Sequence, residues 1–193
     1  GLVATGSYHV SLQFLVGGTC PPSAIDCAQT LAGTITTPAQ QHRYTFAGKA
    51  GEAVSVTAVG SGFGAIAELW APNGQRLAVF SAVNSRLTFG PLPTDGIYTI
   101  LIFANGLNAT GSYHVSLRFL VGGPCTPSPL VCGVPRTGSI DSIAEQDLYT
   151  FEGLAGQSVT IRASAPGVLG LIAELWGPAG NRVASSPAVD GTF

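Results

Sequence analysis

Four cysteines are the residues of this chain best suited to covalent chemistry, and they form two pairs with the same spacing. Six residues separate Cys20 from Cys27, and six separate Cys125 from Cys132. Zinc sites favour two to four residues between paired cysteines, and no histidine lies near either pair. The spacing therefore favours two local disulfides, Cys20–Cys27 and Cys125–Cys132, each of which would stiffen a Pro-rich loop.

Two carboxylates beside tryptophans are the next candidates. Glu68 and Trp70 fall on one face of an expected strand, and Glu174 and Trp176 repeat this arrangement. Glycoside hydrolysis needs two acids in one site, and each copy has a single acid here. We therefore predict an outward-facing Glu beside an amphipathic Trp, whose ring is a candidate contact with another subunit or a platform for a sugar.

Two histidines complete the list of candidates. His9 and His114 are equivalent by repeat, and no acid or second ligand repeats beside them, so we assign them to a surface or an interface. The chain has no Gly-x-Ser-x-Gly, His-Glu-x-x-His or P-loop motif. We expect no enzymatic activity, no cofactor and no metal. Asn108-Ala-Thr110 is a formal glycosylation sequon in an expected turn.

All of these residues belong to a long internal repeat. The nine residues Ala4–Leu12 recur without change at Ala109–Leu117, an offset of 105 residues that also relates the cysteine pairs. The Glu-Leu-Trp triplets follow one residue later, after a short insertion. Because the repeat is as long as a domain, it predicts tandem globular domains. We expect an orphan last strand at 1–18, a complete domain at 19–123 and a second copy at 124–193.

The composition excludes several classes of partner. Charged residues are 9% of the 193-residue chain, against about 25% in ordinary globular domains. There is no basic patch to bind nucleic acid, and no apolar run approaches about 18 residues, the length of a membrane span. A surface so poor in charge is easier to explain if neighbouring molecules cover much of it.

Strands, not helices, are expected throughout. Tyr8, Val10, Leu12 and Phe14 alternate with polar residues, which is the period of a strand with one buried face. Eight more short strands are separated by Gly- and Pro-rich turns, a pattern typical of an all-β, jelly-roll-like sandwich. These strands are expected near residues 30–36, 41–47, 52–59, 63–70, 75–81, 85–89, 96–103 and 111–121.

An ordered set of motifs accompanies these strands: Tyr44-Thr-Phe46, Gly51-x-x-Val54-x-Val56, Leu69-Trp70-x-Pro72-x-Gly74, Gly96-x-Tyr98-x-Ile100 and Gly111-x-Tyr113-x-Val115-x-Leu117. Together they resemble the bacterial pre-peptidase C-terminal domain. The resemblance implies an eight-stranded sandwich carried on secreted bacterial or archaeal proteins, often as an accessory module of peptidases. The family's acidic position before the first Tyr is His42 in one copy and Asp147 in the other, and the acidic clusters of its calcium-binding relatives are missing.

The phase of the repeat suggests how the protein works. Relative to the complete domain, the second copy is expected to lack its last two strands, whereas the segment 1–18 repeats a last strand with no domain before it. Either the chain is one stretch of a longer tandem array, or residues 1–18 insert into a neighbouring molecule. One donated strand cannot replace two, which favours the array. Both arrangements are head-to-tail, and they build open filaments when they do not close into a ring.

We therefore expect a secreted, structural protein of an extracellular filament or surface layer, with itself as the main partner. The expected inter-subunit strand presents Tyr8, Val10, Leu12 and Phe14. The alternative is an accessory module of a secreted peptidase that holds protein or surface glycans through its Trp70 and Trp176 faces. Regular polymers would favour the first function, and saturable glycan or collagen binding by a monomer would favour the second.

Overall fold

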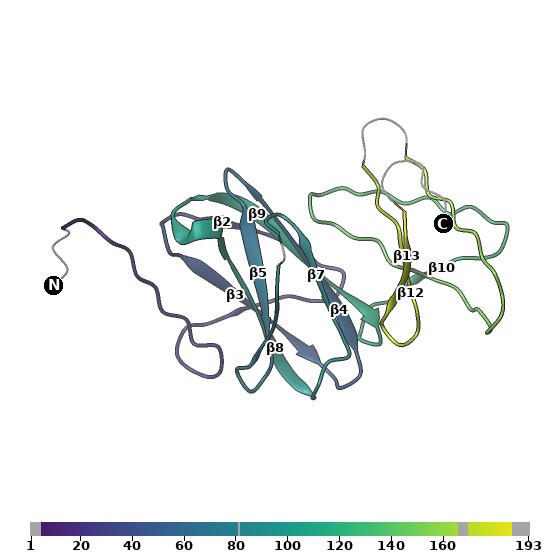
Figure 1. Cartoon of the computed structure of the whole chain (residues 1–193), viewed down its shortest axis with the longest axis horizontal. Helices are drawn as coiled ribbons and strands as arrows, with labels where there is room; N and C mark the ends of the chain where they lie inside the picture. Colours follow the sequence, from purple (N-terminus) through teal and green to yellow (C-terminus); the bar gives the residue numbers. More distant parts are fainter. Residues whose placement is uncertain (1–4, 81, 166–169, 187–193) are drawn as a thin grey trace. The chain divides into compact units, whose positions relative to one another are not determined.

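The structure is a computed structural model that describes residues 5–80, 82–165 and 170–186 (Figure 1). Contacts along the chain divide it into two units. The first comprises Gly1–Cys125 and Gly138–Asp147, and the second comprises Thr126–Thr137 and Leu148–Phe193. The predicted boundaries at residues 18 and 123 stay predictions.

The first unit is a β-sandwich of two sheets, with antiparallel neighbours except for one short edge strand. One sheet has the order β1 (Ser23–Ala24), β3 (Gln41–Gly48), β8 (Gly96–Ala104), β5 (Ala65–Trp70) and β6 (Arg76–Val79). The other has the order β2 (Thr30–Ile35), β9 (Gly111–Val121), β4 (Ala53–Ser61) and β7 (Arg86–Phe89). A 3₁₀ turn, Asn105–Leu107, connects β8 to β9.

The core lies between the two sheets because alternate residues of each strand point inward. The largest fully buried side chains come from both sheets, and they include Tyr98 and Ile100 of β8 and Tyr113 and Leu117 of β9. β8 lies between β3 and β5, and Tyr98 to Ile102 are buried on both faces. The sequence prediction of an all-β sandwich, and of β8 as a central strand, is confirmed.

All eight strands predicted for this unit are present, at β2 to β9. The sequence analysis missed β1, which has two residues and pairs in parallel with β3 (Ser23 beside Tyr44). A strand of two residues is too short to show a period. Its position at a sheet edge therefore comes from packing and not from pattern.

Each sheet of the first unit is partly covered on its outer side by chain from outside the strands. Ser55, Ser116 and Arg118 point away from the core and are nevertheless buried. Residues 138–147 cover them: Gln146 accepts a hydrogen bond from Ser55 (2.9 Å) and donates one to Ser116 (3.0 Å). Arg118 Nε donates a hydrogen bond to the carbonyl of Gln146, whereas its buried Nη1 has no partner among the described residues. Hydrogen bonds therefore offset the burial of the two serine hydroxyls in full and that of Arg118 in part.

The second unit repeats part of the first. β10 (Ser128–Pro129) pairs in parallel with β11 (Tyr149–Thr150), in the register of β1 with β3. β12 (Glu174–Trp176) pairs with β13 (Arg182–Ser185) in the register of β5 with β6, and both hairpins carry the same bulge. The turns also match: Gly74 and Gly180 have φ of 83° and 78°, the left-handed region that glycine enters without strain.

In the first unit, β8 joins β3 to β5 within one sheet, whereas the described part of the second unit has no strand joining β11 to β12. Side chains that are core residues in the first unit are therefore open in the second. Tyr44 is 5% exposed and its counterpart Tyr149 is 38% exposed, while Val54 and its counterpart Val159 are 0% and 47% exposed.

The predicted disulfide pairing is wrong. The structure bonds Cys27 to Cys125, with 5.3 Å between their Cα atoms, and leaves Cys20 and Cys132 unbonded. Cys27 precedes β2 and Cys125 follows β9, and these two strands are neighbours in one sheet. The sheet brings the two cysteines together. The bond therefore encloses all the strands from β2 to β9, and not the short loop between Cys20 and Cys27.

The expected strand at residues 1–18 is also absent. Residues 5–18 form no strand, and residues 1–4 lie outside the described residues. A strand is stabilised by hydrogen bonds to a neighbouring strand, which this segment lacks in the single chain. The alternation of apolar and polar residues thus shows that the segment could form a strand in a sheet. It does not show which sheet, or whether the segment joins one.

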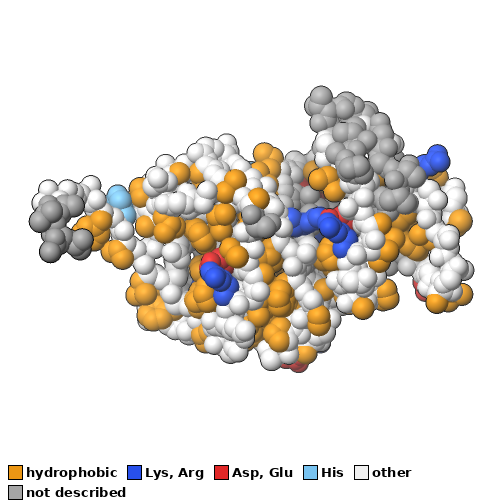
Figure 2. All heavy atoms as spheres, in the orientation of Figure 1, with side chains coloured by type: hydrophobic (Ala, Val, Ile, Leu, Met, Phe, Trp, Pro, Cys, Tyr) orange, Lys and Arg blue, Asp and Glu red, His pale blue; other side chains and the backbone are white. Residues whose placement is uncertain are grey.

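Apolar side chains are scattered over the face shown in Figure 2, and charged side chains appear at few places. This matches the low content of charged residues in the sequence. Among the described residues, no helix is long and apolar enough to cross a membrane.

Candidate self-association site

The N-terminal copy (residues 6–16) repeats the sequence of β9 and differs from it at one position, where Gln13 replaces Arg118. In β9 the apolar face is buried: Tyr113, Val115 and Leu117 are 0% exposed and Phe119 is 2% exposed. In the N-terminal copy the same face is open, with exposures of 85% for Tyr8, 83% for Val10, 71% for Leu12 and 40% for Phe14. One sequence thus occurs as a core strand and as an open segment.

The position of β9 in its sheet shows which contacts a strand with this sequence makes. β9 lies between β2 and β4 and is hydrogen-bonded to both. In the register with β4, Phe119 is opposite Val54, Leu117 is opposite Val56, and Val115 is opposite Ala58. All of these side chains except Phe119 are at most 1% exposed. A strand with this sequence therefore buries one apolar face and satisfies both of its backbone edges.

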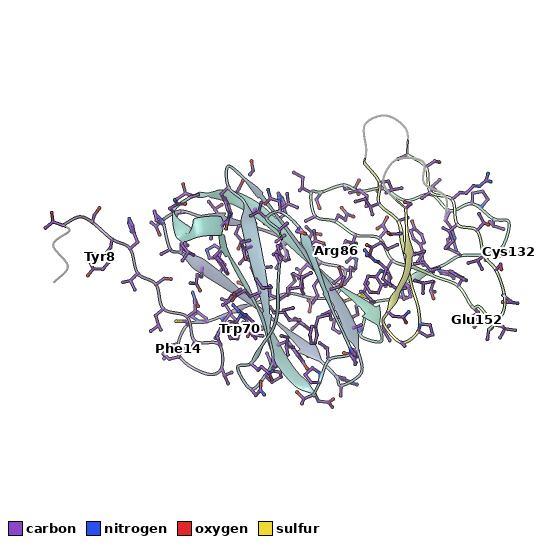
Figure 3. The ribbon with its side chains drawn as sticks, viewed as in Figure 1. Tyr8, Phe14, Trp70, Arg86, Cys132 and Glu152 are labelled. Atoms are coloured by element: carbon purple, nitrogen blue, oxygen red, sulfur yellow. A yellow bond between two sulfur atoms is a disulfide. The ribbon has the colours of Figure 1, made fainter. Side chains whose placement is uncertain are left out.

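The C-terminal end of the N-terminal copy contacts the first unit. Gln13 donates a hydrogen bond to the carbonyl of Gln41 (3.0 Å), and Thr99 donates one to the carbonyl of Leu15 (3.3 Å). Arg43 donates to the carbonyls of Phe14 and Cys20. These contacts hold residues 13–20 against β3 and β8, whereas Figure 3 shows Tyr8 away from these strands.

The hydroxyl of Tyr113, on β9, belongs to a row of hydrogen-bonded polar side chains. The Tyr113 hydroxyl lies 2.7 Å from the Tyr44 hydroxyl and 2.6 Å from Nδ1 of His42. Gln40 Oε1 already accepts from Thr36, so its amide nitrogen donates to His42 Nε2 (2.9 Å). Neutral His42 then carries its proton on Nδ1 and donates it to Tyr113, which donates to Tyr44.

The surroundings of this row of side chains change its titration. Burial raises the pKa of Tyr113 far above its ordinary value, and the neighbouring Tyr44 hydroxyl adds to this effect. Burial likewise raises the pKa of Tyr44. Burial lowers the pKa of His42, so the neutral imidazole is favoured in the folded protein. Protonated His42 would also turn an N–H towards the donating amide of Gln40.

We expect the first unit to lose stability as the pH falls below about 6.5, the ordinary pKa of histidine. The unfolded chain then binds a proton that folded His42 resists, and a state that binds more protons is favoured by acid. The substitution His42→Gln should weaken this dependence of stability on pH between pH 7.5 and 5. Denaturant unfolding, followed by Trp70 fluorescence in a Trp176→Phe background, measures it. Equal pH dependence with and without His42→Gln would contradict the assignment.

The two predicted Glu–Trp pairs each form a closed cluster with an arginine. Glu68 accepts hydrogen bonds from the Trp70 indole (3.1 Å) and from Arg76 (2.7 Å). The Arg76 guanidinium also lies 5.9 Å from the centre of the Trp70 ring. In the second unit Glu174 accepts from Trp176 (3.0 Å) and Arg182 (3.1 Å).

These clusters connect the strands of each hairpin, since Glu and Trp lie on one strand and Arg lies on the next. The indole N–H and the carboxylate are both occupied, which suits a cross-strand clamp better than a sugar platform. The sequence analysis did not single out Arg76 or Arg182. The signal was available, because each follows its Trp by six residues across a Pro-x-Gly turn in both copies.

The other predicted residues are not brought together into a site. His9 is exposed and His114 is half-buried on β9, opposite Ala32 and Val59. Within residues 5–80, 82–165 and 170–186, no three His, Cys, Asp or Glu side chains gather to hold a metal ion. Asn108 is exposed just after the 3₁₀ turn, where a glycan would be accommodated.

No protein-family model and no curated protein matches the chain. Similar solved structures include the pre-peptidase C-terminal domain of collagenase from Bacillus anthracis, with 18% identity over 52% of this chain and 100% of that domain (TM-score 0.44). They also include PliG of Aeromonas hydrophila, a periplasmic inhibitor of g-type lysozyme, with 21% identity over 50% of this chain and 96% of PliG (TM-score 0.40). Likeness at this level carries no argument about function.

Proposed function

We propose that the chain is a structural subunit of a secreted extracellular assembly and polymerises head-to-tail. The N-terminal copy of one molecule takes, in the second unit of the next, the place that β9 has in the first unit. The observation that supports this is the contrast in exposure: the apolar face that is buried in β9 is open at residues 6–16. Donation of a strand to an open sheet edge is a common way to join protein chains.

The repeat defines the register of this pairing. Val54 and Val56 of β4 correspond to Val159 and Ile161 of the second unit. Phe14 would therefore lie opposite Val159, and Leu12 opposite Ile161, as Phe119 and Leu117 lie opposite their partners in β4. The pairing would bury Val159, which is 47% exposed, and give the backbone of the donated strand hydrogen-bonding partners at residues 159–161.

The same pairing is heterologous, since the donor and acceptor surfaces differ and lie in different units of the chain. Each molecule keeps a free acceptor when it donates and a free donor when it accepts, so growth does not stop at a dimer. The donated strand takes, in the second unit, the position that β9 has in the first. It does not fill the position of β8, which a different polypeptide segment would have to take. The disulfide of the first unit is typical of proteins outside the reducing cytosol.

Polymerisation can be tested directly on residues 1–193. Size-exclusion chromatography and negative-stain electron microscopy should show polymers for the unaltered chain and monomers after removal of residues 1–16. Leu12→Asp should have the same effect as the removal, because it places a charge in the buried face of the donated strand. Ser7→Asp is the matched control, since its counterpart Ser112 is exposed in β9.

The alternatives give different results. Polymers that persist without residues 1–16 would show assembly through other contacts and overturn strand donation. A monomer in every sample would overturn polymerisation itself. An excess of the peptide with sequence 5–16 should shorten polymers, whereas a peptide of the same composition in scrambled order should not.

A further inference from the structure

We infer that successive subunits are also joined covalently, by a disulfide between Cys132 of one copy and Cys20 of the next. This inference rests on the proposed strand donation and adds a bond to it. It starts from the unexpected partner of Cys27, which is not the nearest cysteine in sequence but Cys125, 98 residues away.

The repeat shows which other two cysteines correspond to Cys27 and Cys125. Each Cys-x6-Cys pair lies at a junction between repeats: its first cysteine follows a copy of the β9 sequence, and its second cysteine precedes the first long strand of the next domain. Cys125 follows β9, and Cys20 follows the N-terminal copy at the same distance. Cys27 precedes β2, and Cys132 holds the same place in the second unit. The bond Cys27–Cys125 therefore has one equivalent, between Cys132 and the cysteine behind whichever strand completes the second unit.

The local geometry supports this equivalence. Cys27 Sγ lies 3.4 Å from the amide nitrogen of Phe119, so the disulfide lies beside the end of β9. The Cα atoms of Cys27 and Cys125 are 5.3 Å apart, within the usual range for a disulfide. If Phe14 takes the place of Phe119, the segment from Phe14 to Cys20 can follow the same path as the segment from Phe119 to Cys125, because the two segments have the same length.

Both thiols are available for the reaction. Cys20 and Cys132 are unbonded, Cys132 is exposed, and Cys20 is half-buried. With oxidised glutathione as the oxidant, the Cys132 thiolate attacks one glutathione sulfur and releases the other glutathione as a thiolate. The Cys20 thiolate of the next copy then attacks Cys132 Sγ and releases the second glutathione. Two protein thiols are oxidised, one glutathione disulfide is reduced, and the two thiol protons leave to solvent.

Two single variants of the full chain test the bond. Cys20→Ser keeps only Cys132 as a free thiol, and Cys132→Ser keeps only Cys20. Mixed with oxidised glutathione, they should form a covalent dimer on non-reducing gels, with at least about tenfold more dimer than either variant alone. Pairing raises the effective thiol concentration to the millimolar range, well above that of micromolar protein. Peptide mapping should identify a Cys20–Cys132 linkage.

A second substitution distinguishes a disulfide that forms because the strand is donated from one that forms when two molecules collide by chance. Leu12→Asp in the Cys132→Ser chain should reduce the dimer to the level of the single variants, whereas Ser7→Asp should leave it unchanged. A dimer that forms equally with Leu12→Asp would overturn the inference. Native size-exclusion chromatography of the same mixture distinguishes the two proposals: pairing without a covalent dimer overturns only the disulfide, and absence of both overturns strand donation as well.

Discussion

Replacing Cys27 and Cys125 together with serine should lower the free energy of unfolding of the first unit by about 2–5 kcal/mol. The bond closes a long loop, because its two cysteines are 98 positions apart in the sequence, and so restricts the unfolded chain strongly in the chain-entropy model. Both cysteines are also packed against the core. Denaturant unfolding, with Trp70 as the probe in the Trp176→Phe background, measures the loss.

The unbonded cysteines provide the control for this measurement. Cys20→Ser and Cys132→Ser should each leave the stability of the first unit within about 0.5 kcal/mol, as surface substitutions usually do. A destabilisation by Cys20→Ser as large as that of Cys27→Ser would mean that the local pairing predicted from the sequence forms in solution.

Leu117→Ala should lower the free energy of unfolding of the first unit by about 2–5 kcal/mol. Leu117 is fully buried between the sheets, so truncation removes apolar contact and leaves a cavity. Leu12→Ala makes the same change in the same local sequence and should cost the monomer less than about 0.5 kcal/mol, because Leu12 is largely exposed. Denaturant unfolding of both variants, at a concentration where the chain is monomeric, makes the comparison.

The pair of substitutions also has an outcome that would contradict the structure. If Leu12→Ala destabilised the first unit as strongly as Leu117→Ala, the N-terminal copy would be part of the core of its own molecule. It would then not be free to act as a donor.

The strands of the first unit were predictable because each has one face in the core. Alternation in β9 and the doubly apolar sequence of β8 follow directly from burial on one and on two faces. The identity of the N-terminal copy with β9 was equally visible. Whether that copy pairs with another strand was not, because the hydrogen-bonding partner of a strand is not encoded in its own alternation.

The cysteine pairing could not be read from spacing. A Cys-x6-Cys loop is compatible with local closure, and only the neighbouring positions of β2 and β9 bring Cys27 to Cys125. The row of polar side chains at Tyr113 was hidden for the same reason: His42 and Tyr113 are 71 residues apart and meet across the two sheets. The Glu68–Arg76 pair is local, and its repetition as Glu174–Arg182 was a usable signal.

The position of the Cys27–Cys125 bond has a mechanical consequence. A pulling force on the chain reaches Cys27 just before β2 and Cys125 after β9, and these two cysteines are linked. The load then passes through the sulfur–sulfur bond and bypasses the strands between them. About 330 Å of extended chain, at roughly 3.4 Å per residue, is thereby kept from unravelling under tension. The strands between the two cysteines would therefore keep their fold under tension until a reductant reached the bond.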